Sequence, residues 1–195
     1  MSSRFQAVAV FCGSRFGHDP AFREAAAFLG QGIARHGWRL IYGGGHVGLM
    51  GEVADAVLRA GGQVSGVIPH FLSSREVMHE RVSDLEITDS MHARKQSMYA
   101  QSDAFLVLPG GLGTFDEFFE VLTWRQLRLH DKPILVIDVA GWGRELVAVV
   151  DAAIERGFAE PGARELFTLV GDVSEALAAL EAHVPAVQEG DPALL

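Results

Sequence analysis

Short apolar runs alternate with longer amphipathic stretches along most of the chain. The apolar runs, such as "AVAVF", "AFLVL" and "PILVI", contain almost no polar position, which is typical of strands covered on both faces. They predict seven strands, at residues 7–11, 39–42, 63–68, 82–87, 104–108, 133–139 and 167–170. Between them, the helical spacing of apolar residues predicts helices over residues 21–36, 49–60, 91–101, 114–129, 144–156 and 174–182.

Strands that alternate with helices predict an α/β fold. Buried strands of this kind form a parallel sheet with helices packed on both faces. We therefore expect a single doubly wound, Rossmann-like domain over residues 1–183, a size that one compact core can fill. The remaining stretch, "VPAVQEGDPALL" at residues 184–195, is expected to be a loose C-terminal tail.

Three turns of the predicted fold are rich in glycine. They follow the first, second and fifth strands and read "VFCGSRFG", "YGGGHVGLMG" and "LPGGLGTFDE". In an open parallel sheet, the carboxyl ends of the strands meet at one edge, where ligands bind. Because glycine lets a backbone come close to another molecule, three such turns at one edge predict a ligand there.

The glycines of the second turn match a dinucleotide-binding fingerprint only in part. Gly43, Gly45 and Gly48 have the G-x-G-x-x-G spacing, which also requires an acid about 20 residues further on to bind ribose hydroxyls. The next strand ends in "VSGVIPH" without an acid, which disfavours an NAD-dependent dehydrogenase. The third of the glycine-rich turns lacks the Gly-Lys-Ser/Thr of a P-loop, which disfavours an ATPase or a kinase.

The turn after the fifth strand has two interpretations that the spacing does not separate. In the first, the N–H groups of Gly111, Gly113 and Thr114, the Thr114 hydroxyl and the helix dipole bind one phosphate group. In the second, Thr114 and Glu117 form a T-x-x-E capping box that satisfies the N–H groups of the helix itself. Asp116 is expected to be a solvated acid that favours the helix dipole.

The segment "SMHARKQSM" supplies two cations on a predicted helix. Arg94 shares a face with Met91 and Met98, so it should point inward, where it requires a partner. Neither Arg94 nor Lys95 has an acid three or four positions away on the helix. Both are therefore candidates to bind an anionic ligand, although a pair of cations that snorkel at the surface remains the alternative.

Charge and composition exclude several classes of partner. The formal net charge of −9 disfavours a nucleic acid, whereas a small anion held by local groups is still allowed. The single cysteine, Cys12, excludes a disulfide framework and is expected to be a small apolar residue at a strand end. No apolar run approaches the roughly 20 residues of a membrane span, so we expect no membrane partner and a cytoplasmic location.

The titratable residues give no pattern for a metal or a cofactor. The histidines show no H-E-x-x-H or comparable spacing, although His92 could line the ligand site; those considered are His46, His70, His79, His92 and His130. Lys95 and Lys132 are the only lysines, and nothing around Lys95 supports a pyridoxal phosphate Schiff base. We expect neither a metal nor a cofactor.

Taken together, the motifs resemble those of the LONELY GUY family, whose members are cytokinin-activating nucleoside 5′-monophosphate phosphoribohydrolases. "LPGGLGTFDE" is similar to the PGGxGTxxE signature of that family, which is also often labelled lysine decarboxylase. The resemblance runs through "AVFCGS", "YGGGHVGLMG", "VIP", "SSRE", "MHARK" and "LTWRQLRLHDKPI", in this order. It implies hydrolysis of the N-glycosidic bond of an N6-modified adenosine 5′-monophosphate or of AMP, which releases the free base and ribose 5-phosphate.

The resemblance also implies roles for particular residues. Arg94 and Glu117 would be the catalytic pair, and residues 111–114 would hold the 5′-phosphate. The remaining substrate contacts would come from Ser14, Gly44, Gly45, Glu76, Lys95, Gly110, Leu112, Phe115, Asp116 and Thr123, with Gly111, Gly113 and Thr114 at the phosphate.

Two further expectations concern chemistry and assembly. Asp116 and Glu117 lie ~100° apart on one helix, so they cannot flank a sugar and a single carboxylate, Glu117, must suffice. A carrier that binds a phosphorylated ligand without cleaving it is the alternative function.

The helix after the signature is apolar on more than one side, which predicts a homodimer through that helix; its apolar residues are Phe115, Phe118, Phe119, Val121, Leu122 and Trp124.

Overall fold

A parallel sheet of seven strands forms the centre of the domain. The computed structural model describes residues 5–73, 78–79 and 81–183. The strands are β1 (Ala7–Phe11), β2 (Arg39–Tyr42), β3 (Val64–Pro69), β4 (Asp84–Thr88), β5 (Ala104–Val107), β6 (Ile134–Ile137) and β7 (Thr168–Val170). Their order in the sheet is β4-β3-β2-β1-β5-β6-β7, and every pairing is parallel. The predicted doubly wound α/β fold is therefore confirmed.

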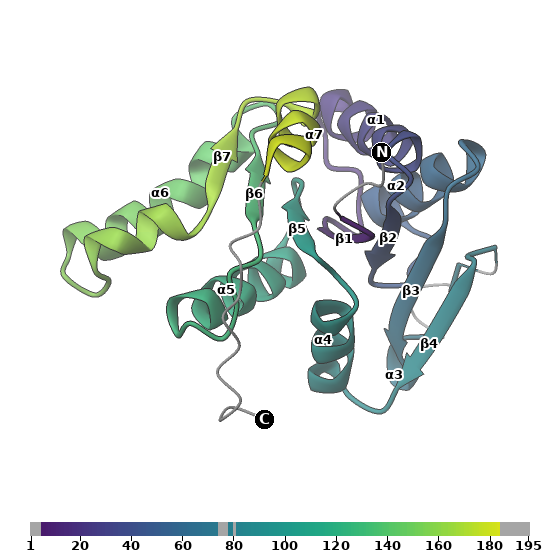
Figure 1. The fold of residues 1–195 in the computed structure, drawn as a ribbon, viewed down its shortest axis with the longest axis horizontal. Helices are drawn as coiled ribbons and strands as arrows, with labels where there is room; N and C mark the ends of the chain where they lie inside the picture. Colours follow the sequence, from purple (N-terminus) through teal and green to yellow (C-terminus); the bar gives the residue numbers. More distant parts are fainter. Residues whose placement is uncertain (1–4, 74–77, 80, 184–195) are drawn as a thin grey trace.

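Helices cover both faces of this sheet. They are α1 (Pro20–Arg35), α2 (Gly48–Arg59), α3 (His70–Ser73), α4 (Met91–Ala100), α5 (Leu112–Gln126), α6 (Trp142–Glu155), the 3-10 helix η1 (Pro161–Leu166) and α7 (Val173–Ala182). Figure 1 shows how these helices are arranged around the sheet. Side chains of α1, α2 and α7 pack with Val8 and Val10 of β1 on one face, while those of α4, α5 and α6 pack with Ala7, Ala9 and Phe11 on the other. The alternation along β1 shows directly that both faces are buried.

The order of the strands reverses next to β1, and this reversal positions the ligand site. The chain moves outward from β1 through β2 and β3 to β4, then returns to form β5 on the other side of β1. The loops that follow β1 and β5 therefore leave the same edge and separate around a crevice. The Gly13 N–H group donates to the Pro109 carbonyl oxygen at 3.0 Å, which joins the two loops at the base of that crevice.

The element boundaries agree with the sequence to within a few residues. β1 and β2 span the predicted residues, and the other strands begin or end one or two residues from the predicted positions. Two short elements, α3 and η1, were not predicted, because four and six residues are too few to show a helical period. The predicted tail at 184–195 lies outside the described residues. None of the described helices is long and apolar enough to cross a membrane.

Candidate active site

The N-terminus of α5 faces a small cavity at the edge of the sheet. Gly111 is the N-cap, and the first helical hydrogen bond runs from Phe115 N–H to the Gly111 carbonyl oxygen at 3.0 Å. The N–H groups of Leu112, Gly113 and Thr114 precede that bond and have no acceptor within their own helix. The cavity has a volume of about 130 Å³ and is lined by Cys12, Gly13, Ser14, Met50, Arg94, Glu117 and residues 111–114.

Thr114 separates the two interpretations of this turn. The N-cap is Gly111, which has no side chain to form a cap, so Thr114 is the third residue of the helix. The capping-box interpretation is therefore wrong. The Thr114 side chain is only 3% exposed, and within the part of the chain that the structure describes its hydroxyl has no hydrogen-bond partner. A buried hydroxyl beside unpaired amides at a helix N-terminus is suited to an anion that accepts from all of them.

Gly110 makes room for that hydroxyl. A Cβ atom at this position would lie 2.0 Å from Thr114 Oγ1 and 2.9 Å from the Gly13 nitrogen. No side chain fits there without moving the backbone of the turn. The second glycine of "LPGGLG", Gly111, has no atom within 4 Å of a Cβ position and faces open space. The two glycines thus have different functions: Gly110 permits close packing, and Gly111 leaves the helix end uncovered.

Arg94 and Glu117 lie together at the other side of the cavity. Arg94 Nη2 is 3.8 Å from Glu117 Oε1, and the two side chains are only 7% and 11% exposed. Arg94 also donates through Nε to the Val67 carbonyl oxygen at 3.1 Å and through Nη2 to the Gly43 carbonyl oxygen at 3.2 Å. The expected inward orientation of Arg94 is confirmed, and the interpretation of Arg94 as a snorkelling surface cation is wrong.

The glycine-rich turn after β2 supports Arg94. A Cβ atom on Gly43 would lie 1.9 Å from Arg94 Nη2, so any other residue would displace the guanidinium group. The fingerprint glycine thus receives an arginine of α4, an arrangement that differs from a dinucleotide pyrophosphate site. The sequence could not show this, because 51 residues separate the two positions.

Lys95 is paired with two carboxylates. Its Nζ lies 3.0 Å from Asp116 Oδ2 and 3.1 Å from Glu120 Oε1, both on α5. Burial lowers the pKa of Lys95, but its hydrogen bonds to these two carboxylates, and their negative charges, outweigh burial and raise the pKa above its ordinary value. Lys95 is therefore firmly charged. Asp116, expected to be solvated, is half-exposed and bonded to this lysine.

The other predicted contact residues lie at varying distances from this cavity. Ser14 lines it. Phe115 turns aside and stacks on Trp142, with ring centroids 5.7 Å apart, and the Thr123 hydroxyl donates back to the Phe119 carbonyl oxygen at 2.7 Å. Gly44 and Gly45 pair with the segment at residues 78–79. Glu76 lies outside the described residues.

Cys12 and Met50 line the cavity although sequence analysis did not place them there. Burial, and then the charge of Glu117, raise the pKa of the Cys12 thiol well above its ordinary value. Cys12 is thus a neutral thiol and a poor nucleophile, in agreement with its interpretation as a small apolar residue. Its position at the end of β1, directly before the first glycine-rich turn, is the signal that could have placed it at the site.

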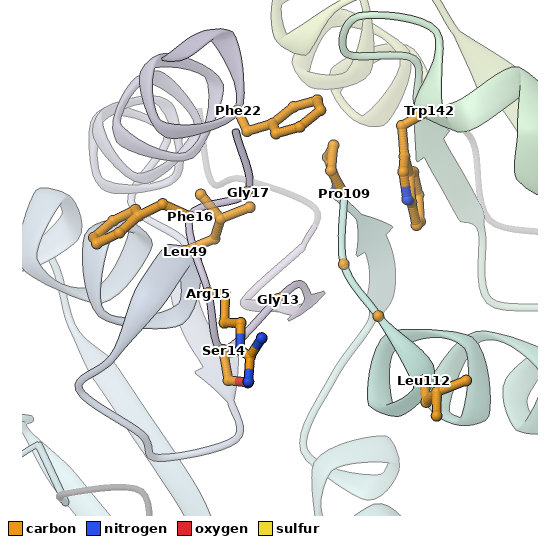
Figure 2. Close-up of a pocket in the computed structure, with 12 residues that line it drawn as sticks. Gly13, Ser14, Arg15, Phe16, Gly17, Phe22, Leu49, Pro109, Leu112 and Trp142 are labelled. Carbon is orange, nitrogen blue, oxygen red and sulfur yellow. The ribbon is translucent and has the colours of Figure 1, made fainter. Parts of the chain in front are cut away.

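A second cavity, of about 500 Å³, adjoins the first along Gly13, Ser14, Gly111 and Leu112. Its wall is mainly apolar and aromatic (Figure 2), with side chains of Phe16, Phe22, Leu49, Pro109 and Trp142. Figure 2 shows that it opens between the loop after β1 and the turn after β5. Two adjoining cavities therefore meet at the N-terminus of α5.

The chain is similar in sequence to a known protein family. A family model described as possible lysine decarboxylase matches residues 50–180. A probable cytokinin riboside 5′-monophosphate phosphoribohydrolase of Oryza sativa subsp. japonica, LOGL5, is 45% identical over 184 residues, which are 94% of this chain and 75% of the relative. The cytokinin riboside 5′-monophosphate phosphoribohydrolase LOG1 of Arabidopsis thaliana is 41% identical over 185 residues, covering 95% and 87% of the two chains.

Solved structures share the fold. The molybdenum cofactor carrier protein of Chlamydomonas reinhardtii superposes with a TM-score of 0.69 at 24% identity, covering 91% of this chain and 97% of that one. The molybdenum cofactor binding protein of Rippkaea orientalis gives a TM-score of 0.68 at 21% identity, covering 92% and 98%. At these identities the likeness shows a common architecture alone.

The orphaned hydroxyl of Thr114 gives a testable prediction. In Thr114→Val the unpaired buried hydroxyl is replaced by a methyl group, so the free energy of unfolding should stay the same or rise by about 1 kcal/mol. Affinity for inorganic phosphate, measured by calorimetry, should fall about tenfold, because one donor to the anion is lost. Ser102→Ala is the matched control: its buried hydroxyl donates to the Met98 carbonyl oxygen, so it should lose stability and keep its phosphate affinity.

Proposed function

Because the chain belongs to the LONELY GUY family of phosphoribohydrolases, we propose that it hydrolyses the N-glycosidic bond of adenosine 5′-monophosphates, including N6-modified ones. The products are the free base and ribose 5-phosphate. One observation carries the proposal: a single cavity is lined both by the uncapped start of α5 and by the buried Arg94–Glu117 pair. Thr114, at this start, has a hydroxyl with no hydrogen-bond partner among the described residues. The start of α5 is suited to bind a phosphate group, and the Arg94–Glu117 pair is suited to act on the N-glycosidic bond.

The 5′-phosphate binds at the start of α5. The N–H groups of Leu112, Gly113 and Thr114 and the Thr114 hydroxyl donate to its oxygens, and the helix dipole stabilises its charge. These donors are directed at the phosphate oxygens, so they can bind a monophosphate without a bridging metal ion. Gly111 leaves the approach to these donors open.

Glu117 acts on the sugar. It follows Thr114 by three residues and so lies on the same side of α5, one turn further along. Phosphate bound at the helix end therefore brings the ribose towards the carboxylate. There Glu117 stabilises the positive charge that develops on the sugar and orients a water molecule. The water oxygen bonds to C1′, the C–N bond breaks with its electron pair passing to the base, and a proton from the water ends on the base.

Arg94 stabilises charge and transfers no proton. A guanidinium group does not give up its proton under ordinary conditions, so Arg94 stays charged during the reaction. Anchored by two carbonyl oxygens, it presents Nη2 towards Glu117 and the cavity. From there it steadies the negative charge on the departing base or on the phosphate. A buried and fixed charge is effective in this role because it needs no reorientation as the bond breaks.

Lysine decarboxylation, suggested by the description of the family model, lacks a suitable amine. Lys95 is held by two carboxylates that keep it charged. Lys132 has a pKa lowered by burial, but its Nζ donates to the Tyr99 carbonyl oxygen at 2.7 Å and lies over the Tyr99 ring. Both amines therefore already have hydrogen-bond or ion-pair partners.

We infer that the reaction takes place in the cytoplasm. A chain whose single cysteine is a buried free thiol suits that reducing compartment, which also contains nucleotides.

The surface beside α5 supports a homodimer. Phe118, Val121 and Leu122 of this helix are buried within the domain. Directly after the helix, Leu127 and Leu129 are 64% and 61% exposed. Apolar residues at this surface are suited to burial against a second copy of the chain.

A homodimer should appear in sedimentation at micromolar concentration. Leu127→Glu should shift the population towards monomer, because a carboxylate would be desolvated in the interface. Phe28→Glu, at a half-exposed apolar residue of α1 on the opposite face of the sheet, should leave the sedimentation coefficient unchanged. A wild-type protein that sediments as a monomer at this concentration would contradict the proposal.

Incubation with AMP and with an N6-modified analogue tests the reaction, with free base and ribose 5-phosphate measured by chromatography. The wild-type protein should release both products. Glu117→Gln should reduce kcat by at least about a hundredfold and still bind the nucleotide, because the glutamine keeps the shape but loses the charge. A wild-type protein that binds either nucleotide and releases no base would instead be the non-catalytic carrier.

Arg94→Lys should reduce turnover with the same substrates by about a hundredfold. A lysine has one nitrogen, which cannot reach the Val67 and Gly43 carbonyl oxygens and also face Glu117. Arg125→Lys is the control, because Arg125 also donates to a backbone carbonyl oxygen, that of Lys132, and has no part in the proposed reaction. Equal turnover in the two variants would rule out the proposed role of Arg94.

A further inference from the structure

A buried histidine lies behind the active site and has no part in the reaction described so far. The His79 side chain is 1% exposed, and its Nε2 is 3.1 Å from Asp55 Oδ1 on α2. Arg81 Nη2 reaches the same oxygen at 2.9 Å, and His46 Nε2 is 3.6 Å from Asp55 Oδ2. Asp55 thus joins the turn after β2, helix α2 and the segment that leads into β4.

This cluster resembles a cation site, but its hydrogen bonds do not suit one. The ligand atoms of His46, Asp55 and His79 lie within 4.8 Å of one another. However, His79 Nδ1 accepts from the Arg81 N–H group at 3.3 Å, so the neutral ring carries its hydrogen on Nε2 and donates it to Asp55. A metal ion would require the lone pair of that nitrogen and would face the Arg81 guanidinium group.

The cluster is therefore a hydrogen-bonded anchor with a neutral histidine. Burial lowers the pKa of His79, and the nearby charges of His46 and Arg81 act in the same direction, against the attraction of Asp55. Burial raises the pKa of Asp55, but the hydrogen bond from His79 and the nearby positive charge of Arg81 bring it below its ordinary value. The pair is a carboxylate that accepts from an uncharged ring, which is a charge-assisted hydrogen bond.

A short chain of backbone contacts leads from this anchor to Arg94. The His79 N–H group donates to the Gly44 carbonyl oxygen at 3.1 Å, and Met78 forms an antiparallel bridge with Gly45. Gly43, the residue before Gly44, accepts a hydrogen bond from Arg94 Nη2 through its carbonyl oxygen. That nitrogen is also the one that faces Glu117.

We propose that His79 is a positioning residue for the hydrolysis: its Nε2–H bond to Asp55 fixes the Gly43–Gly45 backbone, whose first carbonyl holds Arg94 Nη2 against Glu117. This inference rests on the proposed function, because it assigns a task to a residue that does not touch the substrate. It adds a role for His79 and Asp55 to the roles of Arg94 and Glu117.

The turn needs contacts that restrain its backbone, because three consecutive glycines can adopt many conformations. Gly44 has φ +78°, in the left-handed region, and glycine reaches many other conformations at little cost. Val67 holds Nε of Arg94 from β3, so the second nitrogen, Nη2, depends on where the Gly43 carbonyl lies. A turn that moves would leave the guanidinium group bound at one point and free to rotate away from Glu117.

Two substitutions separate the two sides of the histidine ring. His79→Gln places an amide nitrogen near the position of Nε2 and keeps the donor to Asp55. His79→Asn keeps an acceptor near Nδ1 for the Arg81 N–H group and loses the donor. Turnover of AMP by the wild-type protein is measured alongside, so that a failure of the proposed function is seen independently of the variants.

We expect His79→Asn to lower kcat about tenfold, the effect of one lost bond to a charged group, with KM changed less than about threefold. His79→Gln should retain most of the wild-type kcat. The split between kcat and KM follows because the phosphate donors lie on α5, away from the turn after β2. In a crystal structure of His79→Asn, Arg94 Nη2 should have left the Gly43 carbonyl oxygen, a readout that needs no turnover.

His130 provides a matched control. It is also buried, its Nδ1 also accepts from the N–H group two residues on, and its Nε2 lies 2.9 Å from the Val121 carbonyl oxygen. His130→Asn should lower the melting temperature as His79→Asn does and leave kcat unchanged. If the wild type is active and His79→Asn matches it in kcat, or if Arg94 is unmoved in the crystal structure, the positioning role is wrong. Equal loss of kcat in both asparagine variants would also overturn it, since the effect would then be general destabilisation.

Discussion

The candidate active site depends on a helix that begins without a side-chain cap. Because the N-cap of α5 is Gly111, the first three backbone N–H groups of the helix have no acceptor within it, and residues 111–114 line a cavity. In most helices a Ser, Thr, Asp or Asn at the N-cap would satisfy part of this group. Here an anion can do so. The reversal of strand order beside β1 then determines which residues face that anion.

Glycines in this site serve to admit buried polar groups. Gly43 leaves space for the guanidinium group of Arg94, and Gly110 leaves space for the Thr114 hydroxyl. Each polar group is thereby placed closer to the backbone than any side chain would allow. Burying a charge is costly unless it is paired and hydrogen-bonded. Two carbonyl oxygens and Glu117 provide this for Arg94, which explains how a permanent cation can be held beneath the cavity.

Local patterns in the sequence predicted the fold well, but they could not predict side-chain contacts between residues far apart in the sequence. Apolar runs located β1 and β2 because buried parallel strands have few polar positions. The start of α5 lies two residues before the predicted one, since T-x-x-E has the same spacing whether or not Thr114 is the cap. The partners of Lys95 lie 21 and 25 residues away on a neighbouring helix, and those of Asp55 come from two other segments. Such pairs depend on how helices pack, which no local spacing reports.

Fold alone does not decide whether a ligand is cleaved or kept, since solved carrier proteins share this architecture at low identity. The difference must lie in a few side chains. A carrier needs donors for an anion, and the end of α5 supplies them. It gains nothing from a buried arginine held 3.8 Å from a buried carboxylate, because desolvating both groups costs free energy that binding does not require. A hydrolase needs both charges fixed before the sugar develops its own, and this requirement accounts for the cost of burying them.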